Sequence, residues 1–273
     1  MLEALQYDFM QRALLAGVLA SIACGVIGTY VVVKRIVFIS GGISHASLGG
    51  VGIAAWLGWP PLAGALVFSL LAALAIGGAS LKRREHEDTL IGALWVIGMA
   101  IGIVFIAKTP GYATDLMTYL FGNILYVSRN EVLLIILLNI LVLALVAVFY
   151  KEFLALSLDE EFARLRGAPV TLLYLLLLCL VALTVIIMIR VVGIILVIAL
   201  LVLPPAMSRC FTTRLHTMMF LSVAIGIVST TVGIAVSCAT DLPAGACIVL
   251  TAAAAYVVVS ATRRVRFRRP RAS

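Results

Sequence analysis

Long apolar stretches alternate with short polar segments along this chain. Polar residues separate nine such stretches, which cover residues 13–33, 43–58, 61–80, 89–107, 131–150, 170–189, 192–208, 217–238 and 243–262. A helix of about 20 apolar residues crosses about 30 Å of hydrocarbon, whereas strands of a membrane barrel alternate over about 10 residues. The pattern therefore predicts an all-α, polytopic membrane protein with about eight or nine transmembrane helices.

Residues 170–208 carry no charged side chain apart from Arg190. A single helix of this length would be about twice as long as the hydrocarbon layer is thick. An arginine in mid-membrane costs roughly 3 kcal/mol on insertion scales, and a position at the interface removes that penalty. We therefore expect the chain to turn back near Arg190 and Gly193.

The composition supports a membrane protein. Hydrophobic residues make up 64% of the chain and charged residues 12%, against about 45–50% and 25% in soluble domains. Such a composition excludes a disordered chain, a disulfide scaffold and a cytosolic enzyme, all of which need more polar surface. The five cysteines form no CxxC pair and indicate no metal or redox motif.

The net charge of +8 is explained by topology rather than by nucleic acid. Six arginines lie in the tail 263–273, where anionic lipid headgroups account for them. With a cytoplasmic C-terminus, the inner segments hold sixteen basic residues and the outer side only four. The positive-inside rule therefore predicts the N-terminus outside and a basic cytoplasmic tail. The four outer residues are Arg12, Lys108, Arg129 and Arg190.

Two segments between the apolar stretches show helical features. Residues 115–128 (DLMTYLFGNILYVS) are amphipathic and predict an interfacial or re-entrant helix at the outer face. Residues 151–169 are too polar to enter the bilayer. Within them, Ser157 is a candidate N-cap, acids precede bases, and Gly167 follows the last turn. This order predicts a short cytoplasmic helix over about 157–168.

Residues 40–52 (SGGISHASLGGVG) concentrate glycine where a membrane helix is expected. Each interior glycine costs about 1 kcal/mol relative to alanine, so the segment indicates close helix packing or a broken helix that lines a cavity. His45 is its ionisable residue, and a neutral imidazole suits zinc, manganese and iron(II). The alternative is a packing histidine that bonds a backbone carbonyl. Ser44 and His45 do not form a nucleophile and base pair, because adjacent helical residues point about 100° apart.

The chain has no phosphate-binding loop. Its lysines are Lys34, Lys82, Lys108 and Lys151, and none follows a glycine. Any ATP-driven work must therefore come from another subunit. Glu160 and Glu161 fit a charged helix face better than an acid/base pair, and the sequence offers no enzyme signature.

Nearly the whole chain resembles the ABC-3 permease family, the membrane subunits of ATP-binding cassette importers for zinc, manganese or iron. The resemblance rests on SHASLGGVG, EDTLIGALWVIGMAIGIVF, DLMTYLFGNIL, DEEFARLRGAPV and VVGIILVIALLVLPPAMSR, in that order. It implies a single transmembrane permease domain over residues 1–273 in a bacterial-type cytoplasmic membrane. It also implies a homo- or heterodimer of permeases, two cytosolic ATPases and an extracytoplasmic metal-binding protein.

The resemblance assigns functional residues in two places. It makes His45 a metal contact in the translocation path, with no permanently bound cofactor. Many members have an aspartate four residues before this histidine, where this chain has Gly41, so Ser40, Ser44, Asp115 and Asp241 become candidate second ligands. It also assigns the coupling helix that docks on the ATPase, through Asp159, Glu160, Glu161, Phe162, Ala163, Arg164 and Gly167.

Two other classes stay open from the residues. A secondary metal transporter or channel without ATPases predicts paired acids or a proton relay within the spans, which contain almost none. An intramembrane enzyme requires a nucleophile with a base, or an HExxH motif, and the chain has neither.

Overall fold

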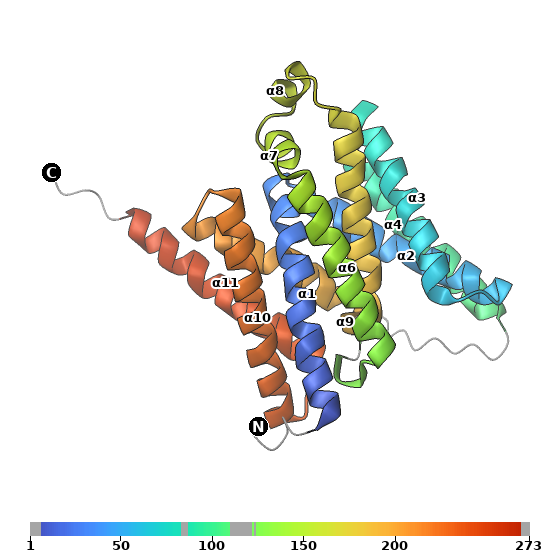
Figure 1. Ribbon diagram of the computed structural model, residues 1–273. Helices are drawn as coiled ribbons and strands as arrows, with labels where there is room; N and C mark the ends of the chain where they lie inside the picture. Colours follow the sequence, from blue (N-terminus) through green and yellow to red (C-terminus); the bar gives the residue numbers. More distant parts are fainter. Residues whose placement is uncertain (1–6, 83–86, 110–121, 123, 269–273) are drawn as a thin grey trace.

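The computed structural model describes residues 7–82, 87–109, 122 and 124–268, and every regular element in those ranges is helical (Figure 1). Eight helices are long and apolar enough to cross a membrane, which confirms the predicted class. The elements are α1 (Asp8–Val33), α2 (Val37–Leu57), α3 (Pro61–Lys82), α4 (Glu87–Lys108), η3 (Ile124–Tyr126), α6 (Arg129–Val148), α7 (Tyr150–Leu158), α8 (Glu160–Leu165), α9 (Val170–Phe211), α10 (Leu215–Thr240) and α11 (Ala244–Arg268).

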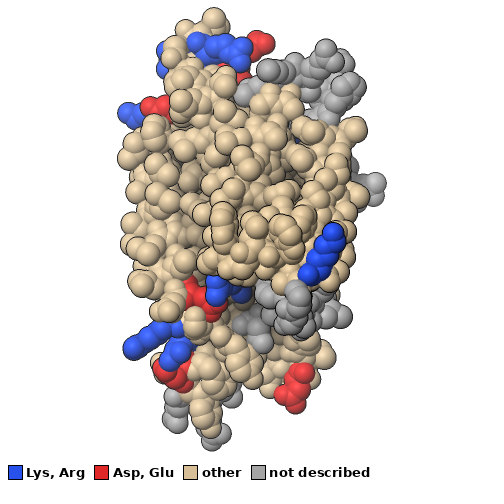
Figure 2. All heavy atoms as spheres, turned by 90° about the vertical axis from the view of Figure 1, so that its right-hand side faces the viewer, with Lys and Arg blue, Asp and Glu red and all other residues tan. Residues whose placement is uncertain are grey.

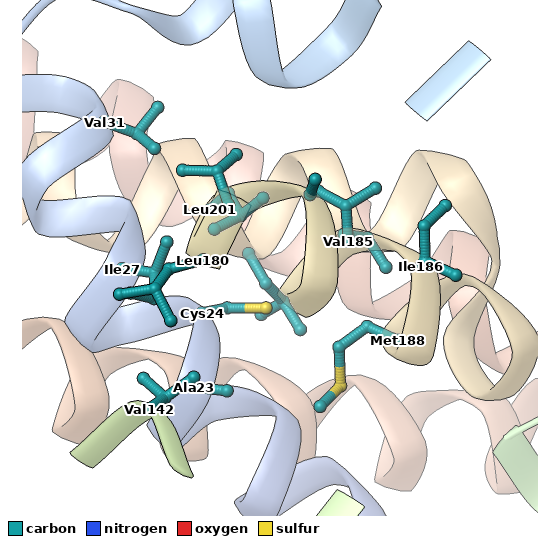
Figure 3. Packing of buried hydrophobic residues seen from close by; sticks show 14 of the residues in the cluster. Ala23, Cys24, Ile27, Val31, Val142, Leu180, Val185, Ile186, Met188 and Leu201 are labelled. Carbon is teal, nitrogen blue, oxygen red and sulfur yellow. The ribbon is translucent and has the colours of Figure 1, made fainter. Parts of the chain in front are cut away.

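The helices form two groups that share α9. Helices α2, α3 and α4 pack together on the right of Figure 1, and α1, α10 and α11 pack together on the left. Helix α9 contacts both groups. Its side chains Leu180, Val185 and Leu201 are buried in the main apolar cluster, with Ile27 of α1 (Figure 3).

Helix α9 is broken at Gly193, whose φ of 79° is left-handed and favours glycine. Val170, at its beginning, lines a cleft with Lys34 of the α1–α2 turn. Thr213, just beyond its end, lines another with Val33, only one residue away. Arg190 instead pairs with Glu131 at the beginning of α6. Both ends of α9 therefore lie at one end of the molecule, and the predicted turn near Arg190 and Gly193 is confirmed.

Charged side chains gather toward the two ends of the molecule, and a broad apolar band separates them (Figure 2). One end, which we call the α8 end, holds the α1–α2 turn, α7, α8 and the beginning of α10. The other, which we call the Arg190 end, holds Asp8, Ser128 and Arg190. This separation is what a chain that crosses a bilayer repeatedly requires.

The polar segment forms two helices instead of the single one expected. Ser157 lies inside α7, so the predicted N-cap at Ser157 is wrong. Asp159 caps α8 instead, because its carboxylate accepts hydrogen bonds from the backbone N–H groups of Glu161 and Phe162, at 2.9 and 3.0 Å. Gly167 ends the helix with a φ of +80°, as its position in the sequence predicts.

The glycines of α2 confirm close packing, and α2 is one continuous helix rather than a broken one. A Cβ atom on Gly50 would overlap the carbonyl oxygen of Gly64 on α3, and one on Gly52 would overlap that of Gly102 on α4. Helix α2 therefore contacts its neighbours at backbone distance, as membrane helices with small residues do.

This contact predicts that Gly50→Ala destabilises the protein by about 1–3 kcal/mol, because α2 and α3 must move apart. The measurement is the fraction of detergent-solubilised protein that stays monodisperse after heating. Gly78→Ala on α3 is the matched control, since a Cβ there meets no atom within 4 Å. Equal monodisperse fractions of the two variants after heating would contradict the close contact.

Candidate metal path and coupling site

His45 lies in the middle of α2 and faces α4. Its ring stacks on that of Trp95, with the centroids 4.2 Å apart and the planes 7° apart. The Trp95 Nε1–H in turn donates to Met99 Sδ at 3.2 Å, one turn further along α4. The imidazole is therefore held in a fixed plane between two helices.

The Nδ1 atom of His45 is buried and has no hydrogen-bond partner among the residues that the structure describes. A packing histidine is expected to satisfy such an atom with a backbone carbonyl, because an unmade buried hydrogen bond costs about 1–3 kcal/mol. The unpartnered nitrogen fits a ligand role for His45, and the stacking of its ring on Trp95 fits a packing role.

The nearest candidate oxygen donors lie on the same helix. The Ser40 hydroxyl donates to the carbonyl oxygen of Val37 at 2.7 Å, and the Ser44 hydroxyl donates to that of Ser40 at 2.6 Å. Each hydroxyl oxygen keeps lone pairs after this donation. A Cβ atom built on Gly41 would meet no atom within 4 Å, so there is open space beside the position where the family resemblance leads one to expect an aspartate.

The other candidate ligands are not brought to His45. Asp115 lies outside the described residues. Asp241 is exposed at the end of α10, with a φ of 53°, in the helix group on the opposite side of α9 from α2. Within the described ranges, no group of three or more His, Cys, Asp or Glu side chains is placed to hold a metal ion. Of the candidate ligands, His45 is therefore the one imidazole that the described residues place in α2.

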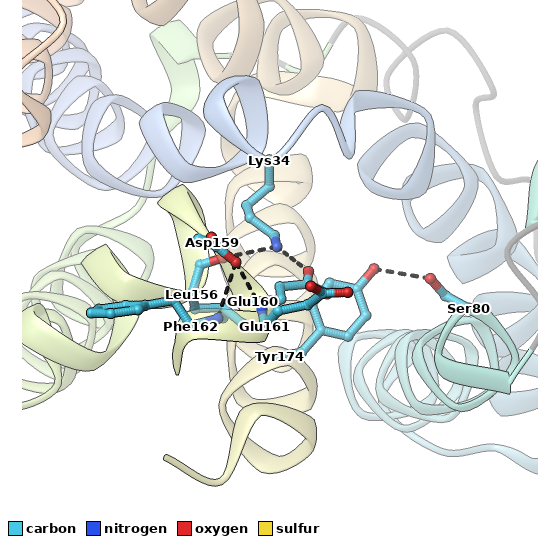
Figure 4. Close-up of polar contacts among 8 residues, drawn as sticks. All are labelled: Lys34, Ser80, Leu156, Asp159, Glu160, Glu161, Phe162 and Tyr174. Atoms are coloured by element: carbon cyan, nitrogen blue, oxygen red, sulfur yellow. Dashed lines mark hydrogen bonds and ion pairs between the residues drawn. The ribbon is translucent and has the colours of Figure 1, made fainter. Parts of the chain in front are cut away.

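The candidate coupling residues follow one another on α8 and its flanks, and Figure 4 draws four of them: Asp159, Glu160, Glu161 and Phe162. Ala163 is buried and anchors the helix to the protein, whereas Phe162 is 48% exposed and Leu165 is 86% exposed. The Arg166 guanidinium lies 4.6 Å from the centroid of the Phe162 ring. Helix α8 and the residue after it therefore present acidic, apolar and basic side chains outward.

A cleft of about 730 Å³ opens between α8 and the helices that carry the candidate metal path. It lies between the α1–α2 turn, the α8 helix and the adjoining ends of α3, α4 and α9. Glu161 and Arg164 of α8, Asp88 of α4 and Lys34 of the turn all line it. Helix α8 thus shares a cleft with the beginning of α2.

Sequence reasoning missed two residues of this arrangement. Trp95 was part of a recognised span, and Lys34 was counted only as an inner basic residue. Trp95 contacts His45, and Lys34 contacts Glu160. Each contact joins segments that are distant in the sequence. No spacing rule within one helix predicts such a partner.

Comparison with known proteins identifies the class of protein that these helices form. A solved structure of PsaBC from Streptococcus pneumoniae in complex with Fab shares the fold, with a TM-score of 0.85 and 32% identity over 94% of this chain and 93% of that one. The chain is a multi-pass helical permease.

The family profile of the ABC 3 transport family matches residues 6–263, and the chain belongs to that family. A manganese transport system membrane protein, MntC, from Halalkalibacterium halodurans is 36% identical over 94% of this chain and 88% of its own. A probable iron transport system membrane protein from Haemophilus influenzae is 34% identical over 98% of both chains. Related chains are thus named for different metals.

Proposed function

We propose that this chain is the permease subunit of an ATP-binding cassette importer that carries a divalent transition metal ion into the cytoplasm. Zinc and manganese are the foremost cargoes, and iron(II) is the third. The observation that supports a metal ion as cargo is the Nδ1 atom of His45, which is buried between two apolar helices and has no described hydrogen-bond partner. The imidazole suits all three ions, and relatives named for manganese and for iron support the same class.

The proposed orientation places the α8 end in the cytoplasm. In the topology predicted from sequence, sixteen basic residues belong to the inner segments and the tail 263–273, against four on the outer side. The whole chain then forms one transmembrane domain in the cytoplasmic membrane. The Arg190 end faces outward, where an extracytoplasmic metal-binding protein delivers the ion.

The proposed partners follow from the missing phosphate-binding loop and from the exposed side chains of α8. Without a phosphate-binding loop it hydrolyses no ATP itself, so two cytosolic ATPase subunits supply the energy. The exposed Phe162 and Leu165 of α8 are the side chains that such a subunit covers. A second permease, identical or related, completes the pair and adds ligands to the single His45.

In this mechanism the ATPases close on ATP and displace α8, and the spans attached to α8 tip between outward and inward openings. His45 holds the ion in transit with few protein ligands. The site must bind the ion weakly, because an importer has to release its cargo inside. Gly41 leaves that place on α2 without a carboxylate, which keeps the site weaker than an aspartate–histidine pair would make it.

Co-purification tests this proposal against an ATPase-independent transporter or channel. The permease, expressed together with a candidate ATP-binding cassette ATPase from the same organism, is solubilised in mild detergent and captured through a tag on the permease. We expect the ATPase to be retained in stoichiometric amount. Recovery of the permease alone, even after crosslinking from a cysteine placed at Arg164, would count against the importer.

A further inference from the structure

Lys34 joins the coupling helix to the helix that carries the candidate metal ligand. Its side chain is only 10% exposed, and its ammonium group pairs with the carboxylate of Glu160 at the beginning of α8. The same Nζ donates to the carbonyl oxygen of Leu156 at 3.0 Å, and it lies 5.8 Å from the ring centroid of Tyr174 on α9 (Figure 4). One cation therefore contacts α7, α8 and α9.

The backbone of Lys34 is equally constrained. Arg35 follows with a φ of 60°, in the left-handed region, and the Ile36 N–H bonds the Val31 carbonyl oxygen at 3.0 Å. Helix α2 begins at Val37, directly after this tight turn. His45 lies eight residues further along, about 12 Å up the helix axis. A tight turn and about two turns of helix therefore connect Lys34 to His45.

We propose that Lys34 transmits the movement of α8 to α2, and so couples ATPase closure to release of the metal from His45. The inference rests on the proposed function, and it adds a residue that neither the family resemblance nor the comparisons assign. Lys34 contacts neither the ion nor the ATPase in this scheme. It is a positioning residue that acts through Glu160.

Burial is what makes this ion pair suited to the task. An exposed pair contributes little, because water and salt screen it. Here Glu160 is 25% exposed and Lys34 10%, so water and salt screen this pair less than an exposed one. The two residues stand 126 positions apart in the sequence, so the pair is a direct link between otherwise separate segments.

The test uses the complete importer in liposomes: permeases, ATPases and the extracytoplasmic binding protein, with Mn²⁺ as the probe. Lys34→Met keeps the length of the side chain and removes its charge. We expect Mn²⁺ transported per ATP hydrolysed to fall about tenfold, within the 5- to 150-fold range typical of coupling between sites. ATPase binding and ATP hydrolysis persist. Lys151→Met, at an exposed lysine on α7, is the control and keeps the wild-type ratio.

A second variant and a double-mutant cycle keep the inference open to refutation. Glu160→Gln breaks the same bond from α8 and is expected to give the same fall, and the double variant Lys34→Met/Glu160→Gln is expected to be no worse than either single one. A wild-type ratio of Mn²⁺ transported per ATP hydrolysed in Lys34→Met would overturn the role of Lys34 but not the proposed function. Losses that multiply in the double variant would do the same. Absence of ATP-dependent uptake by the wild-type assembly would overturn the proposed function as well, so the two failures are distinguishable.

Discussion

Replacement of His45 by alanine is expected to abolish metal uptake while the protein still folds and binds its ATPase. Removal of a residue that merely supports a metal ligand lowers affinity roughly 10- to 100-fold, so loss of the ligand itself is expected to cost at least about 100-fold. We expect the fold to persist because alanine is a strong helix former, although the stacking on Trp95 is lost. The measurement is ATP-dependent uptake of radiolabelled Mn²⁺ or Zn²⁺ by the reconstituted importer.

The control for this experiment is His216→Ala. His216 is exposed near the beginning of α10, at the α8 end, and lies against no part of the proposed metal path. We expect wild-type uptake from it. Equal uptake by His45→Ala and His216→Ala would return His45 to a packing role and would leave the path without a known protein ligand.

The second large effect is expected from the outer face of α8. The triple variant Glu161→Lys/Phe162→Ala/Arg164→Glu changes three exposed side chains and leaves Ala163 and the Asp159 cap in place. It also leaves the Lys34–Glu160 pair intact. A few central side chains usually carry most of the affinity of an interface, at about 2 kcal/mol or more each, so we expect ATPase affinity to fall at least about 100-fold.

The measurement is the concentration of ATPase that half-saturates the detergent-solubilised permease. Lys151→Glu on α7 serves as a control for a charge change near the same surface. Metal selectivity, measured as the ratio of Mn²⁺ to Zn²⁺ uptake at saturating ATPase, is expected to stay the same. Undiminished ATPase affinity in the triple variant would remove α8 as the docking helix.

The sequence was sufficient where hydrophobic length governs the structure. The membrane spans follow from the thickness of the bilayer, and the break in α9 follows from the position of Arg190 and the freedom of Gly193. The glycines of α2 indicated close packing, although not which helices approach them. These features depend on local composition, and local composition is visible in one sequence.

The rest depends on how helices are rotated against one another. The stacking of His45 on Trp95 joins α2 to α4, and the Lys34–Glu160 pair joins the α1–α2 turn to α8. Neither contact has a signature within its own helix. The cap was misplaced for a related reason: Ser157 and Asp159 are both good N-caps, and the choice depends on where α7 ends. Packing of Phe153 and Leu156 in the core keeps α7 helical beyond Ser157.

Reconstitution tests the central claim most directly, namely that this chain is a passive path for metal and that the energy comes from separate ATPase subunits docked on α8. Purified permease is placed in liposomes with and without the ATPases, in the presence of the binding protein, Mn²⁺ outside and ATP on the side of α8. The account predicts accumulation of Mn²⁺ above the outside concentration only when ATPase and ATP are both present. Accumulation against the gradient by the permease alone would contradict it.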